Sequence, residues 1–400
     1  MFPWALLSAI FAFSVGWAFE NPPIRVRLEA GLQKLEIEGV GIQIQGQATP
    51  FEKVSIPQNR KIEIQVAGTN QWKVTRGSQS EIVQAPFLVM RAMELRSRGK
   101  LLPNQVFLTP KSSRKFDVIG VLPLENYLVG VLASEMPLSW PMESLKAQAI
   151  AARSYALVTM KERAKSHFQV ESTILDQVFS HIGNGPDESP LVAKAKAAVK
   201  ESEGQVLLTE TGQTLKAYYH SDCGGKTSSA KYVWGAGIDS GEAVDASCPG
   251  TKKHEWNLRI SASELSAKLQ KYFQRDSEIS SFQMIRPSRE ERVEKIWLLW
   301  ASGEKQKISA HEFRAALGYD QLRSTFFEVA KSEGQYQFKG KGFGHGVGLC
   351  QWGSRQLAQA GEGYEEILHH YYPKARLSGS EKPERLAKIR IEPEPATQTR

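Results

Sequence analysis

Alternating apolar and polar residues dominate the first quarter of the chain. The runs at 24–28, 41–46 and 61–66 each place apolar residues at every second position, which is the period of a half-buried strand. Turn-forming residues such as Gly68 and Gly77 separate these runs. The pattern predicts a β-rich region over residues 24–110.

The periodicity becomes helical near residue 121. A short helix is predicted from Pro123, and a longer one from Pro141 towards residue 165. Between them, Pro137 disfavours a helical conformation in the residue before it, which predicts that Glu135 lies in a loop at a sharp break. The longer helix is expected to be central and buried, because alanines dominate its apolar stripe and let a neighbour approach closely. The stripe consists of Leu145, Ala149, Ala152, Ala156 and Met160.

The rest of the chain mixes both periodicities. A third helix is predicted over 186–203, a strand pair at 205–208 and 214–219, and mixed strands and short helices over 255–330. Another helix is predicted over 364–371. Together these patterns predict an α+β fold, with central helices packed on mixed strands and an inserted α/β lobe.

The N-terminus predicts export. Residues 2–18 carry no charge, and Gly16 and Ala18 occupy the small-residue positions of a cleavage site before Phe19. The alternative is an uncleaved anchor helix, although a span needs roughly 20 apolar residues. We expect a mature protein in the periplasm, cell wall or medium, without an integral membrane domain.

Composition narrows the class of protein. Of 400 residues, 41% are hydrophobic and 24% charged, which are globular proportions and exclude wholesale disorder. The net charge of +8 is spread along the chain. It suits an acidic polymer or surface, and we expect no nucleic-acid partner. Three cysteines are too few for a disulfide scaffold.

Four segments, taken together and in this order, resemble the SpoIID/LytB family of bacterial cell-wall proteins. They read LPLENYLVGV followed by SEMP, LKAQAIAARSYA, YHSDCGGKT followed by VWG, and GFGHGVGLCQWG followed by HYYP. They begin at Leu122, Leu145, Tyr219 and Gly342, respectively.

The resemblance implies a SpoIID-like catalytic core, and the residue patterns at the two ends of the chain complete a domain order. We expect a signal peptide at 1–18, a β-rich region at 19–110, the core at 111–235, the inserted lobe at 236–335, a segment completing the core at 336–377, and a disordered tail at 378–400. The tail is rich in Pro, Glu, Lys and Arg.

The resemblance also implies a function in cell-wall remodelling. The best-known members of the family are peptidoglycan lytic transglycosylases, which cut MurNAc–GlcNAc bonds and prefer glycan strands that an amidase has stripped of stem peptides. The implied partners are therefore glycan strands and a cell-wall amidase. The implied catalytic residue is Glu135 of the SEMP segment.

The surroundings of Glu135 suit this role. A glycosidic bond needs a proton donor for its leaving oxygen. The C-terminal carbonyls of the preceding helix disfavour a nearby negative charge. Apolar neighbours in the sequence, such as Leu132 and Met136, disfavour it too. Both effects favour the protonated acid. The competing interpretation is a solvated loop glutamate.

Other motif residues are candidates for binding glycan. His220 with Ser221, and His345 within its glycines, could hydrogen-bond sugar hydroxyls or serve a tightly packed turn. Gln351 and Trp352, which follow the glycine-rich segment, are further candidates. Trp352 is either a platform for a sugar face or a core residue. The remaining candidates lie on the long helix or in a segment similar to the family's Gln-Val-Tyr, and they are Gln148, Arg153 and Gln177. For Arg153, pairing with a buried acid is the alternative.

Cysteine spacing raises two alternatives. In an exported protein, we expect Cys223 and Cys248 to form a disulfide, with Cys350 free and buried. His220 and Cys223 also have the spacing of zinc ligands. Some relatives hold zinc in a Cys/His-rich segment before Gln-Val-Tyr, but residues 171–176 contain neither residue. We therefore expect no metal and no cofactor.

Two other functions compete with the transglycosylase. One is a Cys/His peptidase or amidase that uses Cys350 and His345, although proximity in sequence does not establish catalytic geometry. The other is a non-catalytic glycan-binding protein or amidase enhancer, because membership of a family does not guarantee its activity.

Overall fold

The computed structural model describes residues 21–46, 54–56, 61–183, 189–235, 255–287 and 291–378. The chain divides into two compact units. Unit 1 comprises residues up to Glu135, then Ala156–Gln205 and the residues from Ser378. Unit 2 comprises Met136–Tyr155 and Val206–Leu377. The predicted signal peptide and the predicted tail beyond Ser378 fall outside the described residues. Among the described residues, no helix combines the length and apolar character needed to cross a membrane.

Two mainly antiparallel sheets form most of unit 1. The larger sheet contains β1 (Pro23–Leu32), β3 (Ile42–Gly46), β4 (Val54–Ile56), β8 (Leu88–Arg91), β11 (Gln105–Pro110), β12 (Phe116–Pro123) and β13 (Val170–Glu171), in the order β13-β1-β12-β11-β8-β3-β4. The smaller sheet contains β2 (Lys34–Val40), β5 (Ile62–Gly68), β6 (Gln71–Arg76), β7 (Gln79–Gln84), β9 (Glu94–Ser97) and β10 (Lys100–Leu102), in the order β10-β9-β2-β5-β6-β7.

Alternating burial along these strands builds one core between the sheets. Ile62 and Ile64 are buried while the residues beside them are not, as the period-two pattern predicts. Trp72 lies fully buried in this core, where its indole N–H donates to the carbonyl of Ala85 at 3.0 Å. Its ring meets Phe116 edge-on, with centroids 5.4 Å apart. The predicted β-rich region is confirmed.

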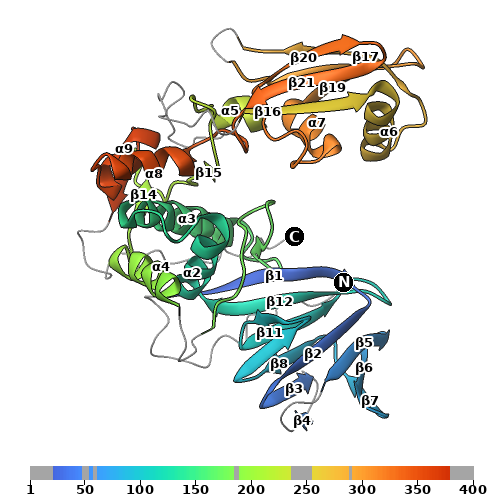
Figure 1. Cartoon of the computed structure of the whole chain (residues 1–400). Coiled ribbons are helices and arrows are strands. Elements are labelled where there is room, and N and C mark those ends of the chain that lie inside the picture. Colours follow the sequence, from blue (N-terminus) through green and yellow to red (C-terminus); the bar gives the residue numbers. More distant parts are fainter. Residues whose placement is uncertain are drawn as a thin grey trace, which may run out of the picture. The chain divides into compact units, whose positions relative to one another are not determined.

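The strand β12 leads directly into the helical part of unit 1 (Figure 1). Helix α2 (Leu124–Glu135) follows Pro123 without a loop and packs against α4 (Pro190–Glu201). Ser189 caps α4 by accepting a hydrogen bond from Val192 N, which satisfies one unpaired amide of the first turn. The predictions for both helices are confirmed.

The long helix α3 (Met142–Glu162) is shared by the two units, which divide after Tyr155. Its four stripe residues from Leu145 to Ala156 are fully buried. Ala147 and Ala151 on other faces are buried as well. The prediction of a central helix that neighbours approach closely is confirmed.

Unit 2 combines small sheets with short helices. Its strands are β14 (Val206–Leu208), β15 (Tyr219–His220), β16 (Glu255–Ser261), β17 (Ile279–Ile285), β18 (Lys295–Trp300), β19 (Lys305–Ser309), β20 (Phe327–Ser332), β21 (Gln335–Lys341) and β22 (Leu349–Cys350), and β23 (Arg376–Ser378) pairs with β14. Its helices besides α3 are α5 (Ala230–Trp234), α6 (Ala262–Phe273), α7 (Ala310–Leu317), α8 (Gln351–Gln359) and α9 (Tyr364–Tyr371).

The elements from β16 to β21 form a lobe with its own core, coloured yellow to orange in Figure 1. Two three-stranded sheets, β16-β21-β20 and β17-β18-β19, accompany α6 and α7. Aromatic residues such as Phe313 and Phe338 fill its interior. The presence of several sheets together with helices confirms the predicted α+β class. The domain boundaries as a whole stay a prediction.

Candidate functional site

Glu135 is the last residue of α2, and not part of the loop that the sequence predicts. The helix reaches it because Pro137 restricts only the residue immediately before it, which leaves Glu135 able to adopt helical angles. Its carboxylate oxygen Oε1 accepts a hydrogen bond from the backbone amide of Val178 at 2.8 Å. The side chain is partly exposed. Glu135 therefore has a fixed partner in unit 1 and is reachable by solvent.

The segment that supplies this amide packs closely against α2. Tyr127 donates its hydroxyl hydrogen to Gln177 Oε1 at 2.9 Å, and Gln177 is fully buried. The rings of Tyr127 and Phe179 lie 5.0 Å apart. Gly130 allows this approach, because a Cβ there would meet the carbonyl of Ser180 and lie 2.5 Å from the Phe179 ring. The candidate Gln177 thus positions this segment.

Ion pairs hold the other end of the same segment. Arg163 donates to both carboxylate oxygens of Asp176, at 2.5 and 3.1 Å. Asp176 also accepts from the amide of Glu171 at 2.8 Å, and its side chain is only 1% exposed. Glu171 in turn pairs with Arg27. These contacts hold residues 171–176 against the rest of unit 1.

Unit 2 brings His220 and His345 together, with ring centroids 5.5 Å apart. The Trp234 ring lies 5.0 Å from the His345 ring and the Tyr218 ring 6.2 Å from it. His220 is buried, whereas His345 keeps some exposure. Sequence reasoning missed Tyr218, because nothing in its local sequence distinguishes it from any tyrosine in a predicted strand.

The two imidazoles take opposite hydrogen-bonding roles. His220 Nδ1 lies 3.0 Å from the carbonyl of Val347, so Nδ1 carries the proton and Nε2 the lone pair. His345 Nδ1 accepts from the amide of Val347 at 3.1 Å, so in its neutral form Nε2 carries the proton. Burial, aided by His220 and by cationic neighbours, holds the pKa of His345 well below its ordinary value. His345 is therefore a neutral donor near pH 7.

Glycines permit the tight path of the segment that carries His345. The residues Gly342, Gly344, Gly346 and Gly348 all have positive φ, between 69° and 113°, a region that favours glycine. At Gly346 a Cβ would lie 2.5 Å from the guanidinium of Arg292. The prediction that these glycines allow special backbone shapes is confirmed.

Arg292 is a buried residue that sequence reasoning missed. Its Nη2 donates to the carbonyl of Cys223 at 2.6 Å, and its guanidinium lies over the Phe326 ring. It contributes to lowering the pKa of His345. Nothing in the local sequence distinguishes it from a surface arginine, because its partners lie far away along the chain.

The other candidates in unit 2 differ in exposure. Ser221 and Trp352 are partly exposed, and Trp352 packs edge-on against Trp140 at 4.9 Å. Gln351 begins α8 and is 3% exposed. Gln148 and Arg153 lie fully or almost fully buried on α3. Exposure favours direct glycan contact by Ser221, His345 and Trp352, and burial favours structural roles for the others. Glycan binding by any of them stays a prediction.

Only part of the cysteine predictions can be compared with the structure. Cys248 lies outside the described residues, so its disulfide with Cys223 stays a prediction. Cys223 and Cys350 are both completely buried. Cys350 is the N-cap of α8, where its sulfur accepts a hydrogen bond from Gly353 N. Such burial does not suit a nucleophile that must reach a peptide substrate.

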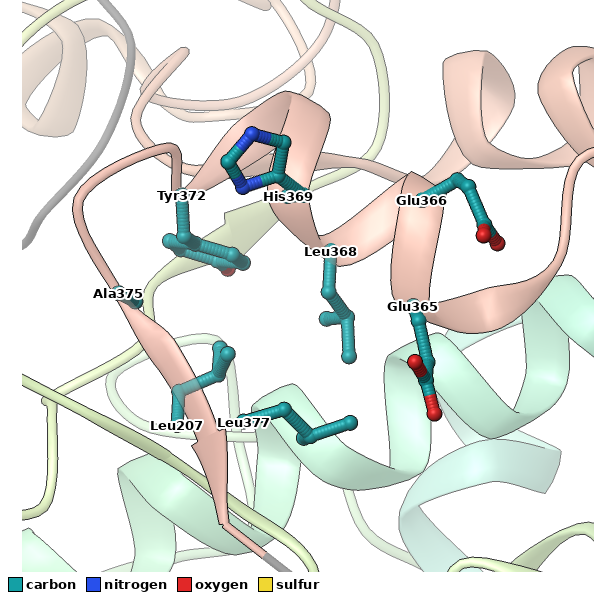
Figure 2. A pocket seen from close by; sticks show the side chains of 8 residues that line it. All are labelled: Leu207, Glu365, Glu366, Leu368, His369, Tyr372, Ala375 and Leu377. Carbon is teal, nitrogen blue, oxygen red and sulfur yellow. The ribbon is translucent and has the colours of Figure 1, made fainter.

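The described residues also contain hollows away from these groups. Figure 2 shows one of about 310 Å³, into which Leu368 and Tyr372 point, with Glu365 and Glu366 to one side. Its lining, which also includes Leu207, His369, Ala375 and Leu377, contains none of the candidate catalytic or glycan-binding residues.

Comparisons with known proteins agree with the motifs. Residues 112–208 match the family SpoIID, described as "Stage II sporulation protein". Residues 241–348, which include the lobe, match "Domain of unknown function (DUF8618)".

Three relatives show the extent of the similarity. An uncharacterized protein of Brachyspira hyodysenteriae is 32% identical over 64% of this chain and 66% of its own length. Stage II sporulation protein D of Bacillus amyloliquefaciens is 29% identical over 64% of this chain and 74% of its own. The amidase enhancer of Bacillus subtilis is 28% identical over 63% of this chain but 40% of its own. By these matches and its four motifs, the chain belongs to the SpoIID/LytB family.

Proposed function

We propose that this protein is an exported peptidoglycan lytic transglycosylase that cleaves MurNAc–GlcNAc bonds, with Glu135 as its single acid/base. Membership of the SpoIID/LytB family supports a role connected with the cell wall. The observation that carries the finer proposal is the carboxylate of Glu135, partly exposed and fixed by Val178 N at 2.8 Å.

A lytic transglycosylase needs only one carboxyl group. The group first protonates the leaving oxygen of the glycosidic bond. The 6-hydroxyl of the same sugar then attacks the anomeric carbon, and the carboxylate takes its proton, which leaves a 1,6-anhydro product. A hydrolase would require a second carboxylate to activate water or to form a covalent intermediate.

The environment of Glu135 contains influences on both protonation states. The end of α2 favours the neutral acid, because the C-terminal carbonyls of a helix disfavour a nearby negative charge. The Val178 amide favours the carboxylate, because a hydrogen bond to the charged form stabilises it. A group with opposing influences suits a cycle in which it must both give and retake a proton.

The experiment is product analysis by mass spectrometry on denuded glycan strands. The wild type should release anhydro-sugar products, and Glu135→Gln should lower their rate by about 10²–10⁴-fold or more. Glu125→Gln, in the first turn of the same helix, is the matched control and should retain activity. If Glu135→Gln formed the product at the wild-type rate, the proposal would be wrong.

The amidase enhancer is the second candidate function, favoured by the name of one relative. In that case the protein would bind glycan and stimulate a cell-wall amidase without cutting the strand itself. Adding wild type or Glu135→Gln to an amidase assay separates the two. Equal stimulation by both, with no anhydro product from the wild type, would favour the enhancer.

A further inference from the structure

Three buried side chains of unit 2 converge although one of them is distant in sequence. A nitrogen of His220 and the sulfurs of Cys223 and Cys350 lie within 4.8 Å of one another. Their exposed fractions are 4%, 0% and 0%. The convergence follows from the parallel pairing of β15 and β22, in which His220 lies opposite Cys350.

The hydrogen bond at Nδ1 is compatible with His220 binding a metal through its other ring nitrogen, Nε2, which is buried. Its Nδ1 donates to the Val347 carbonyl at 3.0 Å, which leaves the lone pair on Nε2. Histidines that bind metals commonly donate their other ring N–H to a carbonyl or carboxylate, and this bond fixes the tautomer and the ring.

Both sulfurs accept backbone hydrogen bonds that favour thiolates, and the Cys350 thiol, when protonated, donates to the Ser221 carbonyl at 3.7 Å. Cys350 Sγ lies 3.3 Å from the amide of Cys223 and 3.3 Å from that of Gly353. Cys223 Sγ accepts from the amide of Gly225, also at 3.3 Å. Donors of this kind stabilise a negative sulfur, and the N-terminus of α8 adds a favourable dipole at Cys350. The thiolate is the form of cysteine that binds metal.

We propose that His220, Cys223 and Cys350 bind one zinc ion or a similar soft divalent metal. Zinc takes sulfur at about 2.3 Å and imidazole nitrogen at about 2.0–2.1 Å, so tetrahedral ligand atoms lie about 3.5–3.8 Å apart. The three atoms need to close by only about 1 Å, which small side-chain rotations supply. Three protein ligands leave the fourth position for water or another ligand.

This site revises the expectation of no metal, and it excludes the predicted disulfide between Cys223 and Cys248. The sequence shows His220 and Cys223 three residues apart, but it does not show that Cys350 joins them through the β15–β22 pair. The ion would link Tyr219–His220 to the start of α8. The ion would also restrain the glycine-rich segment that precedes α8, because Val347 in that segment hydrogen-bonds to both His220 and His345. The inference does not depend on the proposed function.

The first experiment measures metal in the full-length protein, purified without chelators. We expect about one equivalent of zinc per chain, and after exchange with Co²⁺ a sulfur-to-cobalt charge-transfer band. Cys223→Ser and Cys350→Ser should lose both signals. The matched control is Cys248→Ser, which removes the third cysteine of the chain and should retain both.

A second measurement needs only the wild type, in case the serine variants do not fold. After chelation under reducing conditions, added Zn²⁺ should protect Cys223 and Cys350 from alkylation and leave Cys248 reactive, while Mg²⁺ should protect neither. Failure to take up Zn²⁺ or Co²⁺, or a mapped disulfide that contains Cys223 or Cys350 in the purified protein, would overturn the proposal.

Discussion

The backbone amide of Val178 donates a hydrogen bond to the carboxylate of Glu135 across 43 residues of sequence. The donor belongs to an irregular segment that Tyr127, Phe179 and Asp176 hold against the rest of unit 1. The orientation of the proposed acid/base therefore depends on a main-chain group that this segment supplies.

Replacing Val178 by proline removes this donor. Hydrogen bonds to charged groups contribute about 1.5–3 kcal/mol, and about 1.4 kcal/mol corresponds to tenfold in rate. We expect Val178→Pro to lower turnover of denuded glycan by about 10–100-fold. Val178→Ala keeps the amide and should stay near wild type. A folded Val178→Pro protein with unchanged turnover would show that the bond does not matter for catalysis.

Gly130 tests the packing of the same segment. The Cβ of Gly130→Ala would collide with Ser180 O and the Phe179 ring, and overpacking of this kind costs about 1–3 kcal/mol. The midpoint of chemical unfolding should fall accordingly, together with turnover. At the control position, Gly183→Ala, the new Cβ meets only the end of the flexible Leu101 side chain. Equal midpoints for the two variants would contradict the prediction.

Asp176→Asn should weaken the anchor of the segment. The change removes a charge-assisted pair with Arg163 and should lower the free energy of unfolding by about 1–3 kcal/mol. The control is Glu203→Gln, which breaks an exposed pair with Lys200 and should stay within about 0.5 kcal/mol. Protease cleavage near residue 175 should become faster in Asp176→Asn but not in Glu203→Gln. Unchanged cleavage would argue against an anchoring role.

His181 predicts a loss of stability in acid. Burial lowers its pKa from 6.5 to about 4 in the folded protein. The unfolded chain therefore takes up the proton first as the pH falls. The free energy of unfolding is therefore highest above pH 6.5 as far as His181 determines it. It declines as the pH falls from 6.5 towards about 4 and changes little below that. Urea midpoints of His181→Gln should fall less over this interval, whereas a variant of the exposed His369 should follow the wild type. Parallel curves for all three proteins would refute the assignment.

The local sequence predicts those features of the fold that depend on neighbouring residues, such as where helices begin. Pro123 and Pro141 restrict their own backbone angles, and they correctly place the starts of α2 and α3 to within one residue. The alanine stripe correctly predicts a central helix. Glu135 was expected in a loop, since Pro137 follows closely, but it ends α2 because the restriction acts on one residue only.

Long-range pairing accounts for what could not be predicted. Every residue except proline carries a backbone N–H group, so the residue type does not identify Val178 as the partner of Glu135. The pairing of β15 with β22 joins segments that are more than 100 residues apart, with Cys223 N and Cys350 Sγ separated by 127. Arg292 reaches the Cys223 carbonyl over 69 residues. Such contacts depend on the complete fold and leave no periodic pattern.

The strand β21 runs from the lobe straight into Gly342, while Arg292 reaches back from the lobe to the carbonyl of Cys223. The lobe is thus not a removable insert. A shortened protein without residues 255–341 would have to join residue 254 to Gly342 and supply another donor for the Cys223 carbonyl. An exchange of lobes between relatives would have to carry the arginine along with the sheet, so the two segments are constrained to change together.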